Sequence, residues 1–272
     1  EVIAQNEMSI SDISEEMLYD RLEKHYQTMV ASAAKAVNAP QDMPGVDFIK
    51  GQSLKQAQYS ESQTLGGSYL NNIMTMALSC CEVNAGMGRI CAAPTAGACG
   101  VLPAVLVTYY REYGIPEEKM IEAMYVAAGI GQIIANRAYL AGASGGCQAE
   151  IGSGSGMAAA AICYIKGGTM EQLGHACAMA LKNLMGLVCD PVGGLVEVPC
   201  VKRNVGGAVN ALAAADMALA GIVSQIPVDQ VIDAMKEVGD KMDVSLKETG
   251  FGGVAATPTA DEVVKRLGLE LK

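Results

Sequence analysis

The cysteines are the residues whose type and spacing best predict chemistry in this chain of 272 residues. Three of the nine lie in segments rich in glycine or proline, and they are Cys147 in "GASGGCQAE", Cys189 in "GLVCDPVGG" and Cys200 in "VEVPCVKRN". Such loops allow thiolates to converge and leave backbone N-H groups free to hydrogen-bond to sulfur, as an iron-sulfur cluster requires. A [4Fe-4S] cluster held by three thiolates would leave one iron open as a Lewis acid. Structural or redox-active thiols are the alternative interpretation.

The other cysteines give weaker signals. Cys163 and Cys177 lie within apolar helical patterns, where cysteine usually packs as a small hydrophobic residue. Four more form a C-C-x9-C-x7-C series, and they are Cys80, Cys81, Cys91 and Cys99. This series lacks the tight C-x2-C pairing of a zinc site, so we interpret it as structural, with metal binding as the alternative.

Helices must position these residues, because apolar residues recur at helical spacing while the alternation typical of strands is almost absent. Two capping boxes are predicted, Thr169-x-x-Gln172 and Thr259-x-x-Glu262. Seven helices are predicted, at residues 17–37, 116–141, 155–165, 170–185, 205–223, 228–242 and 261–267.

The predicted fold class is therefore all-α: a compact multi-helix domain with a buried central helix and Gly/Pro-rich loops that carry the candidate ligands. The central helix is placed at 205–223, where Asp216 is the only charged residue. One domain is expected over residues 1–272, with an N-terminal helical segment at 1–44. Residues 45–67 are polar and aperiodic and are predicted to be a linker or loop.

Composition excludes several functional classes. A net charge of −10 argues against nucleic acid or an anionic membrane surface as a partner. No uncharged apolar run approaches the roughly 18 residues of a membrane span. The first residues are acidic and polar, unlike a signal peptide, and an odd number of cysteines does not suit a disulfide framework, so we expect a cytoplasmic location.

Four long motifs resemble those of the α chain of iron-sulfur-dependent L-serine dehydratases. They are "EVNAGMGRICAAPTAGACG", "GGCQAEIGSGSGMAAAA", "LVCDPVGGLVEVPCVKRN" and "ETGFGGVAATPT". The similarity covers nearly the whole chain. In that family three cysteines in matching contexts bind a [4Fe-4S] cluster, and the resemblance assigns this role to Cys147, Cys189 and Cys200.

The resemblance also implies a partner. It suggests an all-helical catalytic domain and a separate β chain with an ACT-like regulatory module, hence a heterodimer or higher oligomer. Single-chain relatives end in a cysteine that can cap the fourth iron, whereas this chain ends in "KRLGLELK". Either the fourth iron is open to solvent and substrate, or another ligand fills it.

The implied reaction converts L-serine to pyruvate and ammonia without pyridoxal phosphate, and the substrate carboxylate then needs donors. The segment "GSGSGM" is predicted to begin a helix, so its N-H groups with Ser153, Gly154 and Ser155 could bind an anion. Thr95 in "APTAGACG" offers a second such place, with a catalytic role. The alternative is that both segments are close-packing loops between helices.

Charged residues directly after Cys200 could complete the site. Arg203 and Asn204 are predicted to bind substrate. A cation at this position would balance the negative charges of the cluster and of the substrate carboxylate. Lys202 could be the base that removes the α-proton if burial lowers its pKa. Solvated surface positions are the alternative for this pair of cations, and the base could also come from the β chain.

Two other functions compete with serine deamination. The first is a related lyase acting on L-threonine or L-cysteine. Threonine differs from serine by one methyl group, and a pocket distinguishes such substrates only weakly. The second is a non-catalytic helical protein whose thiols bind metal or simply pack.

Overall fold

The computed structural model describes residues 2–43, 48–59 and 63–269. In these ranges the regular structure is helical and contains no strand, apart from one isolated bridge between Cys189 and Lys247, which confirms the all-α prediction. None of the described helices is long and apolar enough to cross a membrane. The α-helices are α1 (Val2–Ser11), α2 (Glu15–Asn38), α3 (Gln52–Gln58), α4 (Gly67–Ala85), α5 (Val101–Tyr113), α6 (Glu117–Arg137), α7 (Gly142–Gly145), α8 (Ser153–Ile165), α9 (Met170–Asn183), α10 (Cys200–Leu219), α11 (Val228–Lys241) and α12 (Pro258–Leu267).

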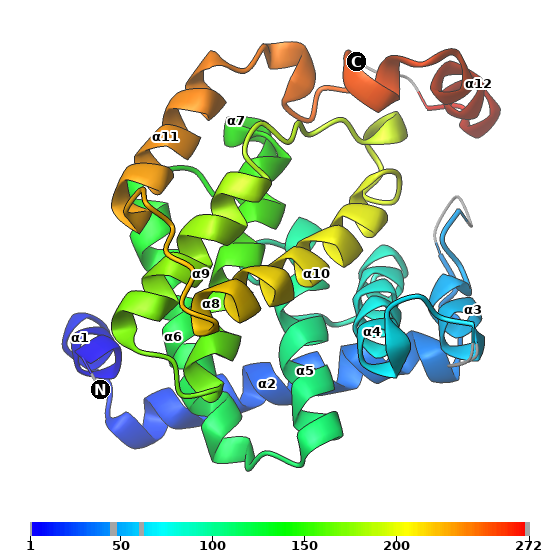
Figure 1. Cartoon of the computed structure of the whole chain (residues 1–272). Helices are drawn as coiled ribbons and strands as arrows, with labels where there is room; N and C mark the ends of the chain where they lie inside the picture. The colour runs from blue at the N-terminus through cyan, green and yellow to red at the C-terminus, as the bar shows by residue number, and fades with distance from the viewer. Residues whose placement is uncertain (1, 44–47, 60–62, 270–272) are drawn as a thin grey trace.

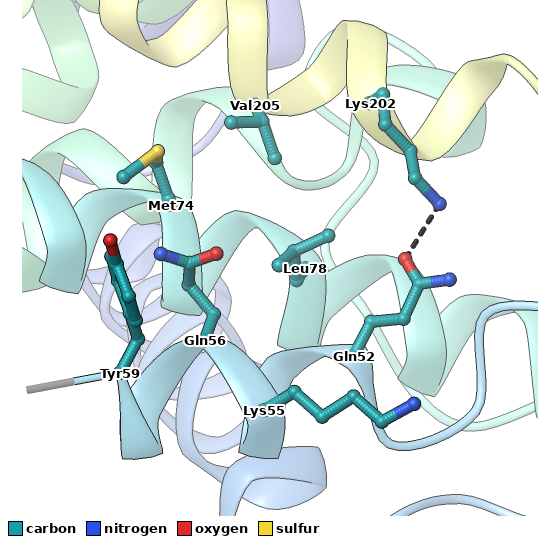
Figure 2. Close-up of a pocket in the computed structure, with 8 residues that line it drawn as sticks. All are labelled: Gln52, Lys55, Gln56, Tyr59, Met74, Leu78, Lys202 and Val205. Atoms are coloured by element: carbon teal, nitrogen blue, oxygen red, sulfur yellow. Dashed lines mark hydrogen bonds between the residues drawn. The ribbon is translucent and has the colours of Figure 1, made fainter. Parts of the chain in front are cut away.

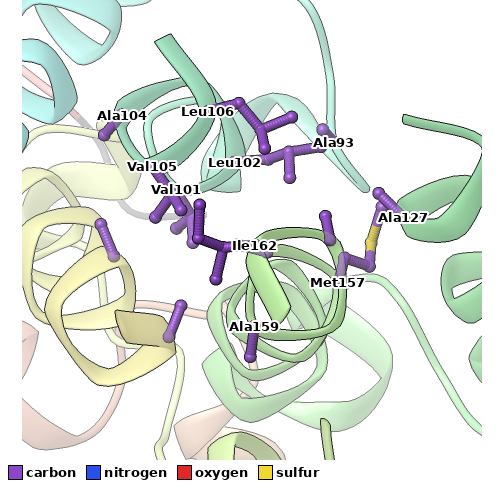
Figure 3. Packing of buried hydrophobic residues seen from close by; sticks show 14 of the residues in the cluster. Ala93, Val101, Leu102, Ala104, Val105, Leu106, Ala127, Met157, Ala159 and Ile162 are labelled. Carbon is purple, nitrogen blue, oxygen red and sulfur yellow. The ribbon is translucent and has the colours of Figure 1, made fainter. Parts of the chain in front are cut away.

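Helix α8 lies at the centre of the molecule, surrounded by α5, α6, α9 and α10 (Figure 1). Its small residues let four helices approach closely, and every residue from Ser153 to Cys163 is buried. Figure 3 shows Met157, Ala159 and Ile162 of α8 among the apolar side chains of its neighbours. Helix α10, the expected central helix, is buried on one face only, because Lys202 and Asp216 point outward from it.

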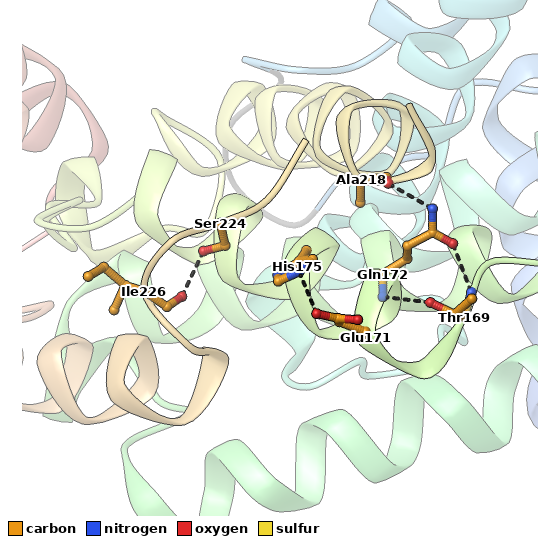
Figure 4. A network of polar contacts seen from close by, with 7 residues as sticks. All are labelled: Thr169, Glu171, Gln172, His175, Ala218, Ser224 and Ile226. Carbon is orange, nitrogen blue, oxygen red and sulfur yellow. Dashed lines mark hydrogen bonds and ion pairs between the residues drawn. The ribbon is translucent and has the colours of Figure 1, made fainter. Parts of the chain in front are cut away.

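One predicted cap is confirmed and the other is wrong. At the start of α9, Thr169 Oγ1 accepts from the Gln172 N-H (3.2 Å) and Gln172 Oε1 accepts from the Thr169 N-H (2.9 Å), as Figure 4 shows. The predicted box at Thr259 does not form. Helix α12 begins earlier, at Pro258, whose fixed φ and missing N-H suit the first helical position.

The polar segment predicted as a linker at 45–67 contains helix α3, which packs on α4. The fully buried carboxylate of Glu82 on α4 accepts from the N-H groups of Gly51 (2.8 Å) and Ser53 (2.7 Å). An acidic group is favourable at the N-terminal end of a helix, so Glu82 fixes the start of α3. Residues 45–47 and 60–62 of the predicted linker lie outside the described residues.

Candidate functional site

The backbone around Cys147 differs from the sequence prediction. Gly146 has φ +76°, a conformation that favours glycine, and Cys147 then leads into a π-helical turn, Gln148–Gly152, which continues directly into α8. Cys147 and Gly152 both have helical dihedrals. Helical backbone therefore runs through the segment "GSGSGM", and the free helix N-terminus predicted there as an anion site is not present. Single π-helical turns of this kind often occur at functional sites.

The fold brings Cys147, Cys189 and Cys200 together from three separate segments. Cys147 precedes the π-turn, Cys189 lies in the loop after α9, and Cys200 is the first residue of α10. All three are buried. Burial raises the pKa of the Cys147 and Cys200 thiols to about 12 and raises the pKa of Cys189 as well. Each thiol also interacts electrostatically with at least one of the others, so the three lie near one another, and we refer to them as the thiol cluster.

The loop that carries Cys189 is held by a neighbouring segment. The Cys189 N-H donates to the carbonyl of Leu246 (2.8 Å), and the Glu248 N-H donates to the carbonyl of Cys189 (2.6 Å). These two bonds make the isolated bridge. The motif "ETGFGGVAATPT" therefore begins directly against one candidate ligand.

Arg203 places a positive charge beside the thiols. Its guanidinium is hydrogen-bonded to Cys147 and lowers the pKa of both Cys147 and Cys200, opposing part of the effect of burial. Nη1 donates to Asp190 Oδ1 (2.6 Å) and to the carbonyl of Val188 (2.7 Å). Asp190 is 2% exposed, and its second oxygen accepts from the Val254 N-H (2.6 Å). This ion pair fixes the guanidinium against the cysteines.

Glu150, which was not predicted as a site residue, lies on the π-turn beside the thiol cluster. It interacts electrostatically with Cys147, Cys189 and Cys200. Thr95 Oγ1 donates to Glu150 Oε1 (2.9 Å), and the Gly142 N-H also donates to the carboxylate. Burial raises the pKa of Glu150. The only sequence signal was its position within the motif "GGCQAEIG", three residues after Cys147.

Two glycines allow the surrounding loops to approach the Glu150 carboxylate. A Cβ at Gly97 would lie 2.9 Å from Oε2. A Cβ at Gly142 would lie 3.0 Å from Oε2 and 2.7 Å from Cys189 Sγ, so the Glu150 carboxylate and the Cys189 thiol flank the same residue. Side chains at either position would collide with the site.

The serines predicted to bind substrate lie inside the helix packing. Ser155 Oγ donates to the carbonyl of Gly207 (2.8 Å) and accepts from Asn210 Nδ2 (2.9 Å), which ties α8 to α10. Ser153 is fully buried, and its hydroxyl has no hydrogen-bond partner among the described residues. Gly154 packs closely against the loop before α5, because a Cβ at this position would lie 3.3 Å from the carbonyl oxygen of Ala93.

Asn204 holds the neighbouring loop in place. Its Nδ2 donates to the carbonyls of Gly97 (2.7 Å) and Cys200 (3.0 Å), and its Oδ1 accepts from the Gly100 N-H (2.9 Å). Both amide donors are therefore used within the protein. Asn204 orients the loop that carries Thr95 rather than offering free donors to a ligand.

Lys202 lies in a different place from the thiol cluster. Its Nζ donates to Gln52 Oε1 (2.6 Å) across a groove of about 560 Å³ between α3, α4 and α10 (Figure 2). Partial burial lowers its pKa, and Cys81 is the one thiol among the groups that shift it. Adjacent residues of a helix point about 100° apart, which explains why Arg203 faces the cluster and Lys202 does not.

Five of the other six cysteines are buried, and Cys91 is half-buried. Cys163 and Cys177 are fully buried in the apolar core. In the C-C-x9-C-x7-C series, the Cys81 thiol is hydrogen-bonded to the Cys99 thiol. Among the residues that the structure describes, no three His, Cys, Asp or Glu side chains are arranged to hold a metal ion.

Comparison with known proteins gives consistent matches. Residues 1–255 match the family model described as serine dehydratase alpha chain. A probable L-serine dehydratase alpha chain of Bacillus subtilis is 46% identical over 268 residues, which cover 98% of this chain and 89% of that protein. The L-serine dehydratase alpha chain of Peptoniphilus asaccharolyticus is 42% identical over 264 residues, 97% of this chain and 90% of that protein. L-serine dehydratase TdcG of Escherichia coli is 42% identical over 239 residues, 85% of this chain and 52% of that protein.

Proposed function

Because the chain belongs to the serine dehydratase alpha-chain family, we propose that it deaminates L-serine to pyruvate and ammonia, using a [4Fe-4S] cluster held by Cys147, Cys189 and Cys200. The observation that carries the proposal is the convergence of three buried thiols beside the guanidinium of Arg203. A separate β chain with an ACT-like module is the proposed partner.

The donor set suits a cluster better than a single ion. Each thiolate of an iron-sulfur cluster binds a different iron, so the thiols surround the cluster and do not meet at one atom. This agrees with thiols that are neighbours without forming a mononuclear site within the described part of the chain. Arg203 supplies the positive charge and the hydrogen bond to sulfur expected around such ligands. When bound, the cluster would supply a Lewis acid for the departing hydroxyl.

The chain's own groups then have separate tasks. Arg203 has five N-H donors, and its bonds to Asp190 and Val188 use only Nη1, so we assign it to the substrate carboxylate. Thr95 acts on Glu150 through its hydroxyl, as a positioning residue. The position of Lys202 in the groove with Gln52 argues against its role as the α-proton base.

Cysteine substitutions test this proposal. Cys147→Ala, Cys189→Ala and Cys200→Ala are each expected to lose the cluster and the activity, because each removes one of three ligands. The matched control is Cys163→Ala, which removes a buried core thiol and should keep both. The measurements are iron and sulfide content, visible absorption and pyruvate formation after anaerobic reconstitution with the β chain. A wild-type complex that holds no iron after this treatment would contradict the proposal.

A further inference from the structure

We propose that Glu150 binds the α-ammonium group of the substrate and thereby selects amino acids over acids that lack this group. The inference rests on the proposed function and deepens it, because it assigns the recognition of a second substrate group. Three observations carry it: the position of the carboxylate, its hydrogen bonds, and the lack of a cationic partner for it among the described residues.

Glu150 is the carboxylate that faces the whole thiol cluster. It interacts with all three candidate ligands and shares the space around Gly142 with Cys189 Sγ. Its side chain is half-buried, so it is sheltered from bulk water without being sealed into the core. A ligand bound beside the cysteines would therefore lie close to this negative charge.

No salt bridge involves Glu150 within the described part of the chain. The groups that act on it are Thr95, the Gly142 N-H and the negatively charged Glu248. Each carboxylate oxygen can accept more than one hydrogen bond, so acceptor capacity remains after these two donors. A partly desolvated carboxylate in such surroundings is stabilised by a cation, and an ammonium group supplies one.

Three other acidic groups near the site are already used or more exposed. Asp190 is paired with Arg203 and accepts from Val254. Glu82 accepts from the two N-H groups that begin α3. Glu248 is exposed. Of these four groups, Glu150 is thus the sheltered carboxylate with acceptor capacity left for a ligand.

The charges beside the thiols match an amino acid. Arg203 is a cation in contact with Cys147, and Glu150 is an anion on the turn that follows Cys147. A zwitterionic α-amino acid carries one charge of each sign on two groups attached to the same carbon, so its carboxylate suits Arg203 and its ammonium suits Glu150. Complementary charges of this kind confer specificity for the ligand and its orientation.

The test compares two ligands that differ only in the α-ammonium group and cannot eliminate water. L-alanine and propionate are titrated calorimetrically into the anaerobically reconstituted complex with the β chain. The wild-type complex should bind L-alanine more tightly. Glu150→Gln should weaken L-alanine binding by about tenfold to a hundredfold, the usual effect of losing a hydrogen bond between charged groups, and leave propionate binding unchanged.

Two further variants keep the test decisive if Glu150→Gln does not fold. Glu150→Asp retains the negative charge but shortens the side chain by one methylene group. Thr95→Val removes the hydroxyl that donates to Glu150 Oε1. Both should weaken L-alanine binding by less than Glu150→Gln would, again without an effect on propionate. The matched control is Glu248→Gln, which removes an exposed carboxylate near Cys189.

The inference is overturned if the Glu150 variants keep the wild-type preference for L-alanine, or if Glu248→Gln abolishes that preference instead. Iron content is measured in the same samples. Iron-free wild-type protein would count against the proposed function, whereas iron-loaded Glu150→Gln with unchanged ligand preference would count against the role of Glu150 alone.

Discussion

Individual side chains at the site are oriented by a small number of strong contacts, of which the ion pair between Arg203 and Asp190 is the most buried. Both groups have given up most of their contact with water, and Asp190 also accepts from the backbone of Val254. Removing one partner of a buried pair leaves the other charge without compensation. The same pair that orients the guanidinium toward the cysteines therefore also stabilises the fold.

Asp190→Asn is expected to lower the free energy of unfolding by about 3 kcal/mol, the lower end of the range for a broken buried pair, because Arg203 remains partly exposed. Urea unfolding of the isolated chain measures this. Asp233→Asn is the matched control, since it breaks an exposed pair with Arg137 and should cost less than about 1 kcal/mol. Equal losses in the two variants would contradict the structural role of Asp190.

Helices are positioned by hydrogen bonds at their ends as well as by packing of their apolar faces, as helix α9 shows. The capping box of α9 satisfies two backbone N-H groups, and Gln172 Nε2 also donates to the Ala218 carbonyl (3.1 Å) near the end of α10 (Figure 4). The cap thus fixes both the start of α9 and its contact with the helix that carries Cys200. Helix α12 has no corresponding side-chain cap.

Thr169→Ala is expected to reduce the free energy of unfolding by about 1 kcal/mol, the usual effect of losing an N-cap side chain. Thr259→Ala should change it by less than about 0.5 kcal/mol, because Thr259 lies exposed inside the first turn of α12 and caps nothing. Chemical unfolding of both variants tests the pair. A larger loss of unfolding free energy in Thr259→Ala than in Thr169→Ala would instead support the capping box predicted at Thr259.

At the scale of the whole molecule, the thiol cluster joins three distant parts of the chain: the turn before α8, the loop after α9 and the start of α10. A cluster bound to all three would bind the folded chain and not the unfolded one. Binding of this kind stabilises the native state by mass action.

Removal of iron with a chelator is expected to lower the Tm of the reconstituted complex by roughly 5–10 °C, which corresponds to about 2.7 kcal/mol of binding linkage in a chain of this size. Differential scanning calorimetry under anaerobic conditions measures the shift. The Cys147→Ala complex should show no shift on the same treatment. A wild-type Tm that does not depend on iron would mean that the three segments are not joined by a cluster.

The sequence alone was enough to predict features that depend on local chemistry. Helical periodicity predicted seven of the twelve described α-helices to within about five residues of their bounds but did not predict α4 or α5. The Thr169 cap followed from the residues at its own turn. Apolar surroundings predicted the buried positions of Cys163 and Cys177. These features depend on residues within one or two turns of one another, so they can be read from a single segment.

Only the tertiary structure decided which side chains meet. Helix α10 begins at Cys200 and not at residue 205, and this start sets the phase that turns Arg203 toward the thiols and Lys202 toward Gln52. The π-turn before α8 likewise places Glu150 beside Thr95, 55 residues away in the sequence. Local propensity does not encode such contacts, because they depend on how helices from distant segments pack around α8.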